Sequence, residues 1–233
     1  MLVIERYAVY FAPGAETPLW ETGCCWLGRD SRTGQSLPQP AVEGFSASQI
    51  AALTASPRLY GFHATLKPPF RLVQERTRTQ LEHALSELAA RSNSFVFPRF
   101  AVGQLDGFLV LHEEESSPQT HVLADACVVE LDGFRRAAGN DELARRRARG
   151  LSARQEQLLA QFGYPFVLDQ FRFHMTLTER LPPDDANRLR PWLAEYMSGA
   201  LAAPARCDDL CLFVQERPGQ AFRLLQRFPF KTP

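Results

Sequence analysis

One short pattern, F-H-x-T-L, occurs twice in the sequence and restricts the possible folds more than any other feature. Phe62-His63-Ala64-Thr65-Leu66-Lys67 is followed 111 residues later (63 to 174) by Phe173-His174-Met175-Thr176-Leu177-Thr178. After each copy come two prolines, an amphipathic segment, a strand and a turn. The turns at Asp106-Gly107 and Pro218-Gly219 lie 43 and 44 residues beyond the two histidines (63 to 106, 174 to 218). This recurrence predicts two copies of a strand-helix-hairpin unit.

The two units cover residues of about 60–112 and 171–230. Each is too small to close its own core, so we expect them to stack face to face within a single bilobal domain over residues 1–233. Between them, residues of about 140–161 form an arginine-rich helical insertion with a break at Gly150 and a restart at Ser152. Arginine is densest at Arg145-Arg146-Arg147 and Arg149. This cluster is either a solvated helix face or a basic flap over an anionic substrate.

Successive side chains of a strand point to opposite faces. His63, Thr65 and Lys67 therefore share one face of the first strand, and Arg172, His174, Thr176 and Thr178 share one face of the second. The alternate residues are apolar. Each copy thus offers an apolar face to a core and a polar face that carries an imidazole and a hydroxyl.

Further elements follow from capping and turn residues. We expect strands at Tyr7–Ala12, near Gly107–Leu111, at Asp209–Val214 and at Phe222–Leu225. We expect helices at Gln49–Thr54 with Ser46 as the cap, at Thr79–Arg91, over Thr120–Ala137 and at Asp184–Ser198, and otherwise a loop-rich segment over residues 28–60.

Composition excludes several classes of protein. The 233 residues carry 26 basic and 26 acidic side chains, a formal net charge of zero, which argues against bulk duplex binding and leaves small or terminal substrates. The five cysteines lack C-x-x-C spacing, so neither a disulfide framework nor a zinc knuckle is indicated. No leader-like segment or long apolar run is present, so we expect a cytoplasmic protein that does not contact a membrane.

The paired motifs are suited to acid–base chemistry at a phosphorus atom. Imidazole titrates near neutral pH, so one histidine can act as a base while its partner acts as an acid. The two threonine hydroxyls can donate hydrogen bonds to non-bridging oxygens as charge builds there. Metal hydrolases and serine hydrolases need H-E-x-x-H, H-x-H or G-x-S-x-G motifs, and the sequence contains none of these. We expect no metal and no cofactor.

These motifs resemble those of the two-histidine (2H) phosphoesterase superfamily. Arg6 to Pro13, Trp26 to Asp30, Tyr60 to Lys67 and Phe171 to Thr178 are similar to the bacterial branch of that superfamily named for phosphonate metabolism. The resemblance implies an α+β, pseudo-twofold bilobal fold with two antiparallel sheets, outer helices and a central cleft. It also implies that His63 and His174 are the acid–base pair and that Thr65 and Thr176 bind the phosphate oxygens. Lys67, Arg172, Tyr10 and Tyr164 are the candidate substrate-binding residues.

Two kinds of function remain open. The first is a metal-independent hydrolase, a phosphodiesterase that opens a small cyclic phosphate of a ribose or nucleotide. The alternative within this class is an enzyme that processes an RNA 2',3'-cyclic phosphate end or that has 2'-5' ligase-like activity. The second is a module that binds a nucleotide or sugar phosphate without turnover. Intact His and Thr pairs favour the enzyme, because a binding site would gain more from fixed cations than from neutral imidazoles. The sequence does not define the oligomeric state.

Overall fold

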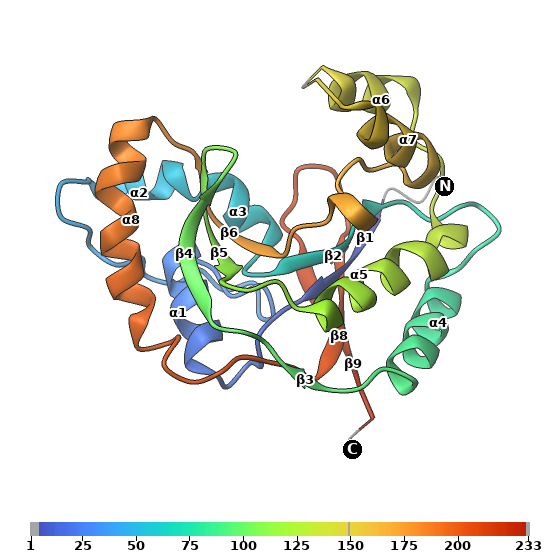
Figure 1. Ribbon diagram of the computed structural model, residues 1–233, viewed down its shortest axis with the longest axis horizontal. Coiled ribbons are helices and arrows are strands. Elements are labelled where there is room, and N and C mark those ends of the chain that lie inside the picture. Colours follow the sequence, from blue (N-terminus) through green and yellow to red (C-terminus); the bar gives the residue numbers. More distant parts are fainter. Residues whose placement is uncertain (1–4, 149, 232–233) are drawn as a thin grey trace.

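Seven strands of the computed structural model form one antiparallel sheet in the order β4-β5-β6-β2-β1-β8-β9 (Figure 1). The structure describes residues 5–148 and 150–231. The strands of this sheet are β1 (Arg6–Phe11), β2 (Ala64–Phe70), β4 (Phe100–Leu105), β5 (Phe108–Glu113), β6 (His174–Arg180), β8 (Asp209–Gln215) and β9 (Arg223–Pro229). Two short strands, β3 (Phe95–Val96) and β7 (Arg206–Cys207), pair separately. The α+β class with antiparallel strands agrees with the sequence-based expectation.

The sheet consists of two parts that meet at a narrow junction. Within the described residues, β2 and β6 share a single paired position, Ala64 with Met175. The lobe with β4-β5-β6 lies on one side of this junction, and the lobe with β2-β1-β8-β9 lies on the other. The expectation that the two units stack face to face is therefore wrong. Their strands join edge to edge, and the two histidine strands are neighbours.

The two sequence units exchange their hairpins. The hairpin β4-β5 belongs to the first unit but pairs with β6 of the second unit. The hairpin β8-β9 belongs to the second unit but reaches β2 of the first unit through β1. Each lobe therefore contains one histidine strand and the other unit's hairpin, which closes a core that neither unit forms from its own residues.

Helices cover the outer sides of both lobes. They are α1 (Pro18–Leu27), α2 (Ala47–Leu53), α3 (Ala55–Tyr60), α4 (Arg78–Ala90), α5 (Pro118–Glu130), α6 (Asn140–Arg147), α7 (Ala153–Phe162) and α8 (Pro183–Ser198), with 3-10 turns η1 (Asp132–Phe134) and η2 (Leu168–Gln170). Helix α8 packs on β4 and β5, and α4 packs on β8 and β9. The pair α6 and α7 stands at one end of the lobe that contains β1 and β2, at the upper right of Figure 1.

Local signals explain several helix boundaries. Ser46 and Ser152 each accept a hydrogen bond from the third helical residue, which returns one to the cap, so both predicted starts are confirmed as capping boxes. The predicted helix over 120–137 ends earlier, at Glu130, because Arg135 and Arg136 pair with Leu72 and Arg71, just after β2, instead. Helices α1 and α3 were not predicted; α1 has an N-cap at Thr17 and a left-handed Gly28 at its end.

The predicted alternation of the histidine strands is confirmed at most positions. Phe62, Ala64 and Leu66 are buried, as are Phe173, Met175 and Leu177. They belong to one large hydrophobic core that includes residues from both lobes. In the described part of the chain, no helix is both long enough and apolar enough to cross a membrane.

Candidate active site

His63 is fixed at the start of β2 by the backbone that precedes it. Gly61 ends α3 with φ 86° and ψ 175°, a conformation that disfavours residues with a side chain. A Cβ atom at Gly61 would also lie 2.6 Å from the Cβ of Ser31. The Gly61 carbonyl accepts a hydrogen bond of 2.9 Å from Nδ1 of His63. Because Nδ1 carries the proton, Nε2 of the neutral ring is the basic nitrogen.

His174 repeats this arrangement on β6. Its Nδ1 donates a hydrogen bond of 2.7 Å to the carbonyl of Arg172, again two residues earlier in the chain. Both imidazoles therefore have the same tautomer and leave Nε2 available for proton transfer. The two rings also lie close enough for the charge of His174 to affect His63.

The environment lowers the pKa of both histidines. Burial lowers the pKa of His63 to about 4, opposed by its hydrogen bond to Gly61 and assisted by the positive charge that His174 can carry. Burial also lowers the pKa of His174, but the carbonyl of Arg172 and the charge of Asp106 act in the opposite direction. The two histidines are thus inequivalent, and a nearby carboxylate favours protonation only at His174.

A cavity of about 520 Å³ connects the two histidine strands. His174, Thr176, Thr65 and Arg172 line it. The Thr65 hydroxyl lies 3.2 Å from Nε2 of His63 and donates to it when that nitrogen is unprotonated. Thr65, Thr176 and His174 therefore border one space, whereas His63 is not among its lining residues and reaches it only through its contact with the Thr65 hydroxyl.

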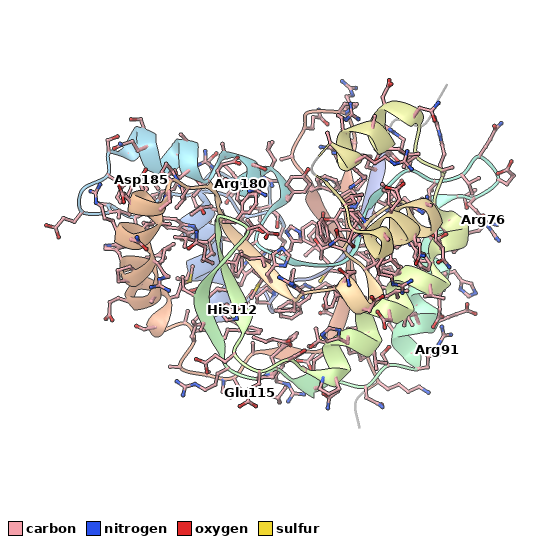
Figure 2. The ribbon with its side chains drawn as sticks, turned by 45° about the horizontal axis from the view of Figure 1, so that its top comes forward. Arg76, Arg91, His112, Glu115, Arg180 and Asp185 are labelled. Carbon is pink, nitrogen blue, oxygen red and sulfur yellow. The ribbon has the colours of Figure 1, made fainter. Side chains whose placement is uncertain are left out.

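Two charged residues of this cavity were not identified from the sequence. Asp106 occupies the turn between β4 and β5 with φ 49°, and Arg180 lies at the end of β6 with its guanidinium 4.9 Å from the Phe108 ring. Figure 2 shows Arg180 beside that hairpin. Asp106 reaches His174 only because the hairpins are exchanged. The repeat spacing predicted the turn at Asp106, but the sequence near this turn did not indicate that Asp106 would lie near His174.

Tyr10 and Tyr164 occupy different positions around the site. The Tyr10 ring is buried and stacks on the His63 ring, with centroids 3.7 Å apart and planes inclined by 24°. The Tyr10 hydroxyl is buried and has no hydrogen-bond partner among the described residues. Burial raises the pKa of Tyr10 well above its usual range. Tyr164 lines the active cavity and packs its ring against Arg146, whose guanidinium lies 5.0 Å away.

Lys67 and Thr178 depart from the predicted polar faces. The Lys67 side chain is 2% exposed, and its Nζ donates to the Val128 carbonyl at 2.9 Å and lies 3.6 Å from Asp132. Burial lowers the pKa of Lys67 to about 8. Thr178 is buried and accepts a hydrogen bond from the Leu109 amide. Lys67 thus anchors β2 to α5, whereas Arg172 is exposed at the active cavity.

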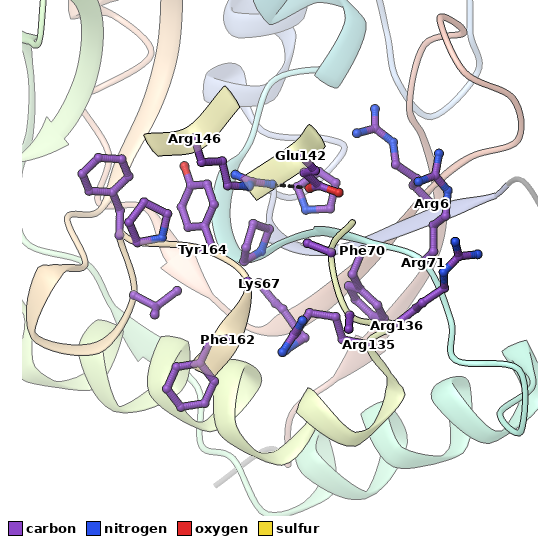
Figure 3. A pocket seen from close by; sticks show the side chains of 18 of the residues that line it. Arg6, Lys67, Phe70, Arg71, Arg135, Arg136, Glu142, Arg146, Phe162 and Tyr164 are labelled. Atoms are coloured by element: carbon purple, nitrogen blue, oxygen red, sulfur yellow. Dashed lines mark hydrogen bonds and ion pairs between the residues drawn. The ribbon is translucent and has the colours of Figure 1, made fainter. Parts of the chain in front are cut away.

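A second cavity of about 540 Å³ adjoins the first. The two share Pro68, Tyr164, Phe166 and Val167 in their linings. Seven basic residues line the second cavity: Arg6, Lys67, Arg71, Arg135, Arg136, Arg145 and Arg146. Figure 3 shows Arg6 and Arg71 on one side, with Arg146 and Tyr164 across from them. Arg149, the last arginine of the predicted cluster, lies outside the described residues.

The arrangement of ionisable groups suits proton transfer. In the described part of the chain, no group of three or more His, Cys, Asp or Glu side chains is placed to hold a metal ion. His112 lies opposite His174 in the β5-β6 ladder, but its Nδ1 donates to the Glu113 carbonyl. The site therefore offers two imidazoles, two hydroxyls and several guanidinium groups.

The chain has an α+β fold in which two histidine strands are neighbours and each histidine is anchored to the carbonyl two residues earlier. The chain belongs to the family described as "Protein of unknown function (DUF1045)", whose model matches residues 65–223.

Two relatives share about a third of their aligned residues with this chain. Both are called "Ribose 1,5-bisphosphate phosphokinase PhnN". The protein from Janthinobacterium sp. (strain Marseille) is 37% identical over 231 residues, which are 97% of this chain and 51% of that protein. The protein from Laribacter hongkongensis (strain HLHK9) is 36% identical over 222 residues, 94% of this chain and 50% of that protein. The chain thus spans about half the length of these relatives.

Similar solved structures include E. coli LigT with 3'-AMP and with NADP+. The first is 15% identical, covers 98% of this chain and 99% of LigT, and has a TM-score of 0.39. The second is 14% identical, covers 97% of this chain and 98% of LigT, and has a TM-score of 0.44.

Proposed function

We propose that this protein is a metal-independent phosphodiesterase that hydrolyses a small cyclic phosphate carried by a ribose. The observation that supports this most directly is the matched anchoring of the two imidazoles. Each donates from Nδ1 to the carbonyl two residues earlier, at 2.9 Å for His63 and 2.7 Å for His174, so Nε2 is the basic nitrogen of both rings; at His63 it faces the Thr65 hydroxyl. Such a pair can remove one proton and supply another in the same step.

The proposed reaction uses water as the nucleophile. Nε2 of one histidine takes a proton from water as its oxygen forms a bond to phosphorus. The bond from phosphorus to one ribose oxygen breaks, and that oxygen takes the proton held on Nε2 of the other histidine. Thr65 and Thr176 donate hydrogen bonds to the non-bridging oxygens, where negative charge increases in the transition state. The product is a phosphomonoester beside a free hydroxyl.

The asymmetry of the site supports His63 as the base and His174 as the acid. Asp106, in the β4-β5 turn, lies in the lobe of His174 and favours its protonated form. The corresponding turn of the other hairpin has Pro218 in place of a carboxylate, and the pKa of His63 is lowered to about 4. His63 is therefore neutral, as a base requires, over a wider pH range.

The names of the relatives support a phosphorylated ribose as the substrate class. Both are named for a ribose bisphosphate, although this chain corresponds to only about half of each. The neutral net charge of the chain also favours a small substrate over a long polyanion. Two alternatives compete with this proposal: processing of an RNA 2',3'-cyclic phosphate end, and binding of a nucleotide or sugar phosphate without turnover.

A screen of cyclic phosphates in the presence of EDTA tests the proposed function. We expect hydrolysis of at least one ribose or nucleotide cyclic phosphate at a rate that the chelator does not change, because the two imidazoles supply both proton transfers. The measurement is release of the phosphomonoester, with chelator-treated protein supplemented with Mg²⁺, Mn²⁺ or Zn²⁺ as the control. Activity that disappears with EDTA and returns with a divalent ion would contradict the mechanism.

The pH profile tests the assignment of roles. Since the base must be neutral and the acid protonated, kcat/KM should be bell-shaped. Both pKa values lie below the ordinary histidine value of 6.5, so the maximum should lie between about pH 4 and that value. In Asp106→Asn, loss of the carboxylate should move the alkaline limb to lower pH and leave the acid limb in place. Asparagine also tolerates the positive φ of this turn. A shift of the acid limb alone would reverse the assignment.

A further inference from the structure

The cavity lined by seven basic residues has no role in the proposed reaction. Glu142 is the one acidic residue in the described lining of this cavity. Such an excess of positive charge is costly unless an anion balances it. Seven of the 26 basic residues of the chain line this one cavity, although the net charge of the whole chain is zero.

The basic residues of the cavity fall into two groups. Some are held by the protein itself. Arg135 pairs with Asp132 and donates to the Gln161 carbonyl, and Arg146 donates to Glu142. In contrast, the guanidinium groups of Arg71, Arg136 and Arg145 make no ion pair or side-chain hydrogen bond with any described residue. These three are available to an anion.

Backbone pairing sets the position of two of the available arginines. The Arg136 amide donates to the Arg71 carbonyl at 2.8 Å, and the Val73 amide donates to the Phe134 carbonyl at 3.0 Å. Leu72 and Arg135 form an isolated bridge between the same segments. Arg71 and Arg136 are therefore carried side by side on an ordered backbone, an arrangement that reduces the entropy lost when both bind one ligand.

The buried Tyr10 hydroxyl, which lines neither cavity, has no hydrogen-bond partner among the described residues. A buried hydroxyl without a hydrogen bond is destabilising, so proteins seldom keep one without a use for it. Arg6, Tyr60 and Tyr164, which line the basic cavity, lie within electrostatic range of this hydroxyl, whereas the Tyr10 ring stacks on His63. Tyr10 thus contacts His63 and is influenced by residues of the basic cavity without lining that cavity itself.

We infer that the basic cavity binds a second, non-reacting phosphomonoester of the same substrate. This inference rests on the proposed function, since it places the cyclic phosphate at His63 and His174 in the adjoining cavity. The ligand is then a small sugar that carries a cyclic phosphate at one end and a dianionic phosphate at the other. Guanidinium groups suit that dianion because they bind phosphate oxygens in a bidentate manner.

The test uses Arg71→Gln, Arg136→Gln and their double variant, with Arg190→Gln as the control. Arg190 is an exposed arginine of α8 in the other lobe. The first measurement is kcat/KM on a ribose cyclic phosphate with and without a 5-phosphate. Each cavity variant should lose roughly tenfold or more on the 5-phosphorylated compound, as expected for a charged hydrogen bond. Activity on the compound without the 5-phosphate should stay unchanged, and Arg190→Gln should match the wild type on both.

The second measurement needs no turnover. Calorimetric titration with ribose 5-phosphate, ribose and inorganic phosphate should show binding of ribose 5-phosphate that both cavity variants weaken. If ribose 5-phosphate binds and both variants weaken its binding while no cyclic phosphate is hydrolysed, the anion subsite is supported and the proposed function is wrong. Equal losses on both cyclic substrates, or inorganic phosphate binding without any preference for the 5-phosphorylated substrate, would overturn the inference.

RNA is the remaining competitor for this cavity. An oligonucleotide that ends in a 2',3'-cyclic phosphate distinguishes it from a small sugar. Single-strand binding weakens by about 0.7 log units per log unit of salt for each phosphate contacted. A strong preference for the oligonucleotide, with a salt dependence that corresponds to about four contacts or more, would overturn the assignment to a small bisphosphorylated substrate.

Discussion

His63→Ala and His174→Ala are each expected to lower kcat by about 10²- to 10⁴-fold, the usual contribution of one general acid or base. Each variant removes the only nitrogen that the mechanism assigns to one of the two proton transfers. Steady-state hydrolysis of the best cyclic phosphate from the screen measures the effect. His83→Ala is the matched control, because His83 is an exposed histidine of α4 whose side chain is 76% accessible.

The His63 variant needs a second substitution to separate chemistry from folding. The imidazole packs on Tyr10 and donates to the Gly61 carbonyl, so alanine removes both of these contacts. His63→Asn keeps a donor in the side chain but has no titratable nitrogen. We expect a melting temperature near that of the wild type and the same loss of turnover. Near-wild-type activity in any variant of either catalytic histidine would refute the paired acid–base mechanism.

Thr65→Ala and Thr176→Ala are expected to reduce kcat by roughly 10²- to 10³-fold, the typical cost of one lost oxyanion donor. Residual activity should remain, because both imidazoles are still present. Thr→Ser at each position retains the hydroxyl and is the control. Loss of substrate affinity with unchanged kcat would show instead that the hydroxyls bind the ground state and the transition state equally.

Local pattern was sufficient to predict the histidine strands and most of their faces, with Lys67 and Thr178 as exceptions. Period-two alternation placed Phe173, Met175 and Leu177 in the core and His174 and Thr176 toward the cavity, as the structure shows. Capping residues likewise defined the starts of α2 and α7. These features depend on contacts within a few residues of the chain, and sequence reports such contacts directly.

Tertiary features of the site could not be predicted in the same way. Strand alternation shows which face of β5 is buried but does not identify the strand it pairs with, so the approach of Asp106 to His174 was invisible. The same limit applies to the basic cavity. Arg71 and Arg136 are 65 residues apart in sequence (71 to 136), and only the pairing of their backbones brings them together. Lys67 lies on the predicted strand, but the α5 carbonyl at Val128 holds its amine.

The exchanged hairpins have a consequence for synthesis of the chain on the ribosome. β1 is made before the other strands of the sheet, yet its pairing with β8 joins residues as far apart as Arg6 and Gln215, 209 positions along the chain. Until β8 is made, one edge of β1 has no partner and its buried side chains have incomplete cover. Native contacts of such long sequence separation slow folding and prolong exposure of an aggregation-prone edge. We therefore expect nascent chains stalled before β8 to depend on chaperones and to be degraded readily by protease.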